Sequence, residues 1–144
     1  MLLIAKILLT IATLGYSAVP ALVDSNETHA TNPSWDPHAR FHVVWQVSSY
    51  VYVALLALYL IWTAGADHWP LWIAFIIAAG AYGGFWSAVF SRPMYGGTLI
   101  SKVNPVPDIK WNIAGKRFGT DANVTAFSVF AGVAVVGAIL LSQA

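Results

Sequence analysis

Two histidines and an arginine stand where a polar segment runs into a long apolar stretch. Residues 35–42 read WDPHARFH, and the apolar stretch that follows is about twenty residues long, enough to cross a membrane. Ionisable side chains near membrane depth are costly, so they mark a functional site by default. Imidazole is also a common metal ligand. Chemistry is therefore expected first at His38, Arg40 and His42.

The residue types at this junction predict where a helix begins. Asp36 suits the N-cap of a helix and Pro37 suits its first position. His38 and His42 then lie one turn apart on one face. That face continues with Trp45, Ser49, Tyr52, Leu56 and Tyr59, which makes it largely polar and aromatic. The stripe is either a hydrogen-bonded aromatic belt at the membrane interface or one wall of a cofactor or substrate site.

A third histidine precedes this helix and widens the choice of ligands. His29 lies near Asp24, Glu27 and Asp36 in the sequence. Together with His38 and His42 it could build a zinc, iron or copper site. The alternative is that these carboxylates are solvated or cap helices, and that no metal is bound.

Composition places the chain in a membrane. Of its 144 residues 58% are hydrophobic and 9% are charged, whereas a soluble domain carries about 25% charged residues. We expect one domain, residues 1–144, in a multi-pass integral protein of the inner or plasma membrane. The net charge of +1, without a long basic run, argues against a nucleic-acid partner. The absence of cysteine excludes thiolate nucleophiles and cysteine-ligated metals.

Four apolar spans are readable, and each is close to the ~20 residues that a bilayer requires. They run from about Leu2 to Leu22, Phe41 to Trp62, Trp69 to Phe90, and Val124 to Leu141. The first, with Lys6 and Pro20, also has features of a signal peptide, but we expect it to be a retained helix. Backbone groups in lipid must bond internally, so the fold class is all-α, a four-helix membrane bundle.

The connections between spans are unequal. Residues 64–68 form a short turn, whereas residues 24–40 and 92–123 are long and must lie on one side. Six of the seven Lys and Arg residues are on that side, which places it in the cytoplasm by the positive-inside rule. The segment from Met94 to Phe118 is rich in apolar residues such as Trp111 and Ile113. We expect it to be an ordered loop that buries them and caps the bundle near His38 and His42.

Small residues dominate part of the third span. Gly80, Gly83 and Gly84 would let another helix approach closely, which favours a homo-oligomer. Alternatively, the missing side chains leave room for a flat ligand beside Tyr82 and Trp86. No charged residue lies deep within spans two to four, which argues against a transporter or pump.

Two short motifs stand out, ARFH at 39–42, and GFW at 84–86 followed by SRPMYGG at 91–97. Their type and order resemble the styrene oxide isomerase family. Members of that family are small four-helix membrane enzymes that bind heme b at the subunit interfaces of a trimer, where the iron acts as a Lewis acid on an epoxide. The resemblance implies this fold, heme b, a trimer, and His42 as axial ligand.

The chain also departs from that family. Trp86 stands where the family has a substrate-binding tyrosine, Ser48 stands where it has an asparagine, and the third helix lacks its aspartate. The string from Asn26 to His42 is also similar to small four-helix membrane proteins without an assigned function, which adds no chemistry.

The leading hypothesis is a membrane-embedded heme-binding enzyme with Lewis-acid or isomerase-type chemistry on a small lipophilic substrate. His42 would ligate the iron and Arg40 would pair with a heme propionate. The pocket would be shaped by His38, Trp45, Ser49, Tyr82 and Trp86. One alternative is a non-enzymatic accessory subunit of a larger membrane complex. Another is a metal-dependent lipid-modifying enzyme that uses His29, His38 and His42.

Overall fold

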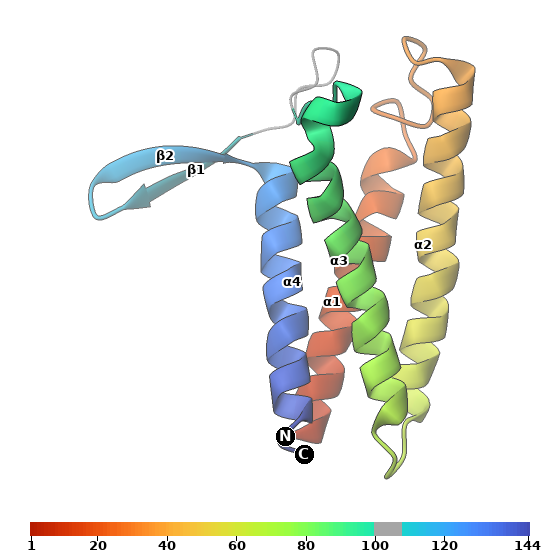
Figure 1. Cartoon of the computed structure of the whole chain (residues 1–144), viewed down its shortest axis with the longest axis vertical. Coiled ribbons are helices and arrows are strands. Elements are labelled where there is room, and N and C mark those ends of the chain that lie inside the picture. The colour runs from red at the N-terminus through yellow and green to blue at the C-terminus, as the bar shows by residue number, and fades with distance from the viewer. Residues whose placement is uncertain (100–107) are drawn as a thin grey trace.

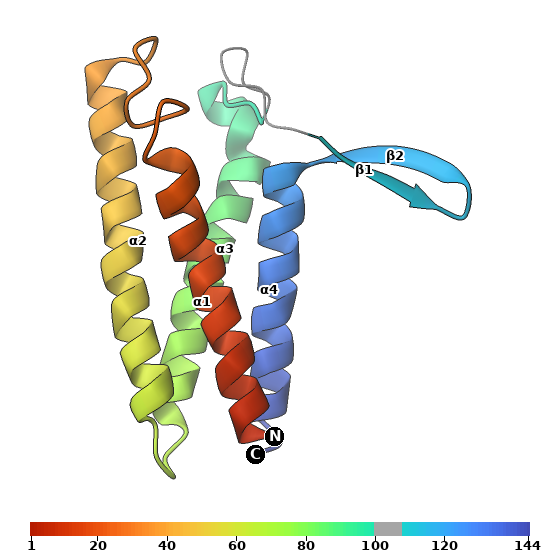
Figure 2. The same cartoon turned by 180° about the vertical axis from the view of Figure 1, so that it is seen from behind.

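Four long helices form a bundle, and a β-hairpin projects from it (Figures 1 and 2). The computed structural model describes residues 1–99 and 108–144. Its elements are α1 (Leu2–Asp24), α2 (Pro37–Thr63), α3 (Trp69–Tyr95), β1 (Asp108–Ile113), β2 (Lys116–Asp121) and α4 (Ala122–Leu141). All four helices are long and apolar enough to cross a membrane. The expected four-helix architecture is therefore confirmed.

Helices α1 and α3 form the centre of the bundle. Each contacts the other three helices, whereas α2 and α4 lie on opposite sides of the bundle and do not touch within the described residues. Both chain termini and the short turn after α2 lie at one end, and the two long connections lie at the other (Figure 1). The prediction that both long connections share one side is confirmed, and the start of α2 lies at that end.

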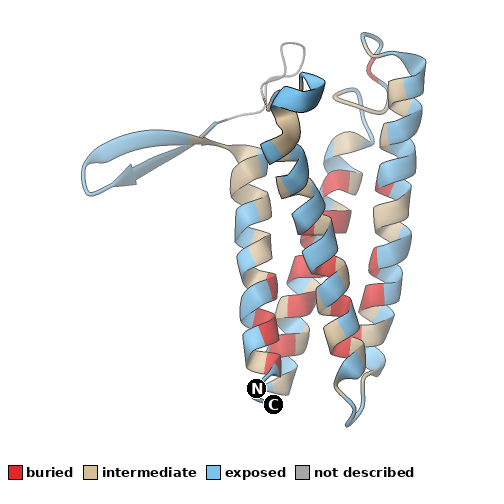
Figure 3. Ribbon diagram, in the orientation of Figure 1, coloured by how far each residue is buried: buried red, intermediate tan, exposed pale blue. Residues whose placement is uncertain are grey.

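The core is built from small residues interleaved with a few large ones. One cluster lies toward the termini and comprises Ala5, Leu9, Ala57, Ile61, Leu71, Ala74 and Leu141. A second comprises Ala12, Tyr16, Ala54, Ala78, Tyr82 and Ala134. Alanine at such positions lets helix backbones approach closely. Buried residues are concentrated in the half of the bundle nearer the termini (Figure 3), so the upper turns of α2 and α3 are more exposed.

Helix boundaries follow local chemistry more closely than apolar content. The Asp36 carboxylate accepts a hydrogen bond from the His38 backbone N–H at 2.8 Å, and Pro37 occupies the first turn of α2. The predicted start of this helix is confirmed. Helix α3 continues past Phe90 to Tyr95 and ends at Gly96, whose φ is +69°. The apolar run predicted too short a helix. Apolar residues indicate the part of a helix that suits lipid, whereas the hydrogen-bonded turns of α3 continue beyond them.

The segment between α3 and α4 differs from the expected apolar loop. Residues 108–121 form an antiparallel hairpin in which Trp111 pairs with Phe118. Its turn places Ala114 at φ +51° and Gly115 at φ +77°, as a two-residue type I′ turn requires. The sequence 108–113, DIKWNI, alternates polar and apolar residues, and this period of two is typical of a strand.

The hairpin does not form the expected cap in its described part. Both strands contact α4, and neither contacts α2 among the described residues. Trp111 is 37% exposed and Ile113 is 59% exposed, so their expected burial is wrong for the single chain. The reason is that the hairpin projects sideways from the bundle (Figure 1) and contacts only α4 among the described helices, so no helix covers these side chains. Residues 100–107 of the expected cap lie outside the described part of the chain.

Candidate functional site

His38 and His42 meet on the exposed face of α2, as their spacing predicted. Their Nε2 atoms are 3.0 Å apart, and their ring planes cross at 85°. At this distance one imidazole donates a hydrogen bond and the other accepts it. Among the described residues, neither ring has another hydrogen-bond partner, and both side chains remain exposed. A polar pair is thus presented outward at the start of α2, a helix long and apolar enough to cross a membrane.

Aromatic rings flank the pair on both sides. Phe41 stacks on His38 with an interplanar angle of 13°, and Trp45 stacks on His42 with an angle of 28°. Phe41 is 59% exposed and Trp45 is 60% exposed. We call these four residues the histidine strip. The two stacked pairs stand nearly at right angles to each other, because the imidazole planes cross at 85°, and the two Nε2 atoms lie between them.

Arg40 does not lie on this strip. Successive residues turn by about 100° around a helix, so Arg40 is about 200° from both histidines. Its side chain is half-buried, and its Nε is buried without a hydrogen-bond partner in the described residues. The expected pairing of Arg40 with a propionate therefore stays a prediction.

The residues expected to shape a pocket are distributed over two helices. Trp45 and Ser49 lie on α2, where the Ser49 hydroxyl donates to the Trp45 carbonyl at 2.8 Å. Tyr82 on α3 is only 3% exposed, and its hydroxyl donates to the Ala12 carbonyl at 2.5 Å. Trp86, one turn further, is half-buried. One chain brings Trp45 beside His42 but buries Tyr82 in the core.

His29 is occupied elsewhere. Its Nδ1 lies 3.4 Å from the Asp24 carboxylate and 2.8 Å from the Thr28 hydroxyl. Among residues 1–99 and 108–144, no three His, Asp or Glu side chains gather into one group. Residues 100–107 contain none of these types. A single chain therefore offers two imidazoles at the strip, and the expected third ligand from His29 is not brought to them.

One polar cluster in the core was missed by the sequence analysis. Tyr16 makes edge-to-face contacts with Tyr50 and Tyr82, with ring centroids 6.4 and 6.1 Å away. The Tyr16 hydroxyl is buried and lacks a hydrogen-bond partner among the described residues. A lone tyrosine within the apolar first span is the signal that would have found this cluster.

The glycine-rich face of α3 is open in the single chain. A Cβ built on Gly80, Gly83 or Gly84 would meet no atom within 4 Å of the described structure. The predicted close approach of another helix is therefore not made within one chain. The face remains free for a partner, and assembly through it stays a prediction.

Substituting Gly80 tests that prediction. We expect Gly80→Leu to weaken assembly, because a branched side chain keeps two helix backbones apart, while the fold of each chain is unchanged. Gly132→Leu on α4 is the matched control, since Gly132 is equally open. The mass of each variant in detergent, measured by light scattering, decides the matter. Equal oligomer distributions for Gly80→Leu, Gly132→Leu and the parent chain would exclude the α3 interface.

Comparison with known proteins identified no relative of this chain. No protein-family model, curated protein or solved structure matches the chain. The functional assignment must therefore come from the residues of the chain itself.

Proposed function

We propose that this chain is a membrane-embedded heme-binding enzyme that performs Lewis-acid or isomerase-type chemistry on a small lipophilic substrate. His42 is the proposed axial ligand. The observation that supports this most is the histidine strip, in which an exposed imidazole pair lies between two exposed aromatic rings. Two exposed imidazoles are unfavourable on a helix surface that only faces lipid, so a further role for them is expected.

Ligand counting favours heme over a bare ion. A protein zinc site uses three or four side-chain ligands, whereas heme iron needs one axial nitrogen from the protein. The strip offers two nitrogens 3.0 Å apart. Two nitrogens side by side on one helix face would not both hold the iron of one heme. One histidine would then ligate, and the other would lose its hydrogen-bond partner and remain beside the site.

The outward orientation of the strip favours a site between subunits. In one chain the strip has one wall, so a flat cofactor bound there would have its other side covered by lipid or by a second copy. A site between copies is also what the similarity of residues 39–42 to the styrene oxide isomerase motif implies. The open glycine face of α3 offers a surface for such assembly.

The residues of the histidine strip would have separate roles in this function. Heme bound there would supply a Lewis acid for an oxygen of the substrate. His42 would hold the group, and Phe41 and Trp45 would exclude water and contact its flat surface. Trp86 cannot act as a phenol, so the substrate orientation used by the styrene oxide isomerases is not available at that position.

An activity assay on the heme-loaded protein tests the reaction class. A panel of small lipophilic epoxides should yield isomeric carbonyl products without any oxidant or reductant, because a Lewis acid only moves electron pairs within the substrate. His42→Ala should abolish turnover, and His68→Ala should retain it. A fully heme-loaded protein that converts no member of the panel would contradict the isomerase assignment while leaving the heme site standing.

A second function is favoured by the glycine face of α3. If a different protein covers Gly80, Gly83 and Gly84, the chain is an accessory subunit of a larger membrane complex. Purification in mild detergent distinguishes the two, because the accessory subunit would copurify with a partner in fixed ratio and would carry no cofactor of its own.

A further inference from the structure

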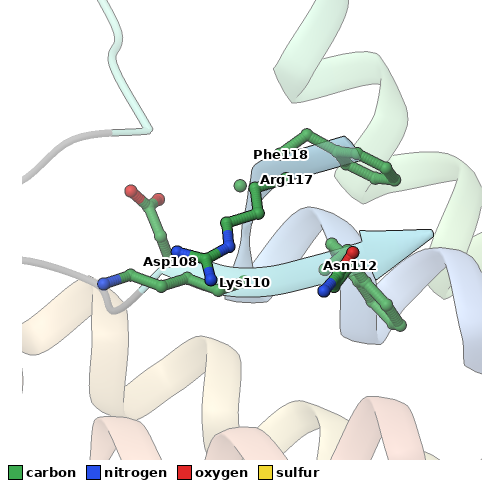
Figure 4. A pocket seen from close by; sticks show the side chains of 7 residues that line it. Asp108, Lys110, Asn112, Arg117 and Phe118 are labelled. Carbon is green, nitrogen blue, oxygen red and sulfur yellow. The ribbon is translucent and has the colours of Figure 1, made fainter. Parts of the chain in front are cut away.

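The β1–β2 hairpin has one apolar and one polar face. Residues directly opposite in an antiparallel pair share a face. Trp111 pairs with Phe118, and Ile113 with Lys116, so one face carries the aromatic and aliphatic side chains. Asn112 pairs with Arg117, and Lys110 with Gly119, so the other face is polar. Figure 4 shows the charged ends of Lys110 and Arg117 away from the ring of Phe118.

Contacts with α4 tell which way the apolar face turns. The Thr120 hydroxyl is 2.7 Å from the Thr125 hydroxyl, which lies in the first turn of α4 and deeper in the span than Asp121. The Trp111 indole N–H donates to the Thr120 hydroxyl at 2.6 Å, so Trp111 lies on that same face. The apolar face is therefore on the side of the hairpin that faces the body of α4.

The position of the hairpin matches the level of a bilayer surface. It leaves the bundle where α4 begins and runs sideways, across the direction of the helices (Figures 1 and 2). If the four helices cross a membrane, this arm lies along its plane. Trp111, Phe118 and Ile113 are 37%, 47% and 59% exposed, so much of their apolar surface is left uncovered by the described residues. Aromatic side chains are typical of this interfacial level.

The distribution of charged side chains on the hairpin is also suited to an anionic lipid surface. Its two acidic residues, Asp108 and Asp121, pair at the base, where Asp121 also caps α4. The outer part carries Lys110, Lys116 and Arg117 and no acidic residue, and all three are exposed. Lys116 lies beside Ile113 on the apolar face, where its long stem can rest in lipid while its ammonium group reaches the headgroups.

We propose that this hairpin is a lipid-binding arm that lies in the membrane interface. Its apolar face enters the boundary between headgroups and acyl chains, and its three basic side chains bind the phosphates of anionic lipids. The positive-inside expectation places the same end of the bundle on the cytoplasmic side, where anionic lipids give the leaflet a negative surface. This role does not depend on the proposed cofactor.

The absence of cysteine from the chain permits a direct test. Ile113→Cys on the apolar face and Asn112→Cys on the polar face are each labelled with a small fluorophore in the full-length protein. The labelled proteins are reconstituted in phosphatidylcholine vesicles with and without phosphatidylglycerol. Quenching by a nitroxide lipid reports contact with lipid, and quenching by iodide reports contact with water.

In vesicles with phosphatidylglycerol, we expect the label at 113 to be quenched by the nitroxide lipid and protected from iodide. The label at 112 should show the reverse. Replacing Lys110 or Arg117 with glutamine should lower the ratio of lipid to water quenching at 113 by about fivefold each, the contribution of one basic residue near an anionic surface. Thermal unfolding of each variant checks that the bundle is intact.

Three outcomes would overturn the proposal. Equal iodide quenching at 112 and 113 would mean that neither face meets lipid. Protection from iodide at 113 without quenching by the nitroxide lipid would mean that a second protein copy covers the face. Identical behaviour with and without phosphatidylglycerol would mean that the basic residues do not recognise anionic headgroups.

Discussion

Replacing His42 with alanine should remove the bound heme from the purified protein. His42 lies on the second turn of α2, its Nε2 lies at the exposed face, and Trp45 supports its ring. If it is the axial ligand, its loss removes the one bond from protein to iron. His38→Ala should have a smaller effect than His42→Ala, because it removes a ring beside the site and leaves the proposed ligand in place.

A matched histidine gives the control. His68 lies at the start of α3, at the opposite end of the bundle, and makes no side-chain hydrogen bond that caps the helix. His68→Ala should therefore keep the full complement of heme. If His42→Ala is folded and keeps as much heme as His68→Ala, then His42 is not the ligand. A larger loss in His38→Ala than in His42→Ala would instead transfer the role to His38.

Adding one methyl group at Gly15 should destabilise the bundle strongly. A Cβ there would lie 2.5 Å from the Phe130 ring and 2.7 Å from the Tyr82 hydroxyl, both well inside contact distance. Tyr82 is itself held by its bond to the Ala12 carbonyl, so it cannot move away without losing that bond. Gly15→Ala should lower the free energy of unfolding by about 1–3 kcal/mol, the usual cost of overpacking a core.

Gly132→Ala provides the comparison for Gly15→Ala, because a Cβ on Gly132 meets no atom within 4 Å of the described structure. It introduces the same methyl group into a helix without a clash. Thermal unfolding in detergent measures both variants. Equal stability of Gly15→Ala and Gly132→Ala would show that α1, α3 and α4 do not pack at Gly15 as closely as described.

The helices were predictable because membrane spans are set by length and apolar content. The start of α2 was predictable from Asp36 and Pro37, and the meeting of His38 with His42 from their spacing of four. These features depend on residues close in sequence, and their geometry is fixed by the helix itself.

The inward faces of the helices were not predictable. A lipid-facing surface and a helix–helix interface are both apolar, so the pattern that separates core from water in a soluble helix is missing. Tyr82 was expected beside the histidines but is buried against Tyr16. Gly80 is open within the described single chain, and its expected contact with a helix of another subunit stays a prediction. The hairpin was not predicted for another reason. The prediction of an apolar loop used the apolar content of this segment and not its alternation of polar and apolar residues.

An absorption spectrum tests most directly the claim that the histidine strip binds heme. The full chain is produced in cells with ample heme and purified in mild detergent without added cofactor. We predict a Soret band at a constant ratio of heme to protein across the purification. A colourless protein that also fails to take up added hemin would contradict the claim.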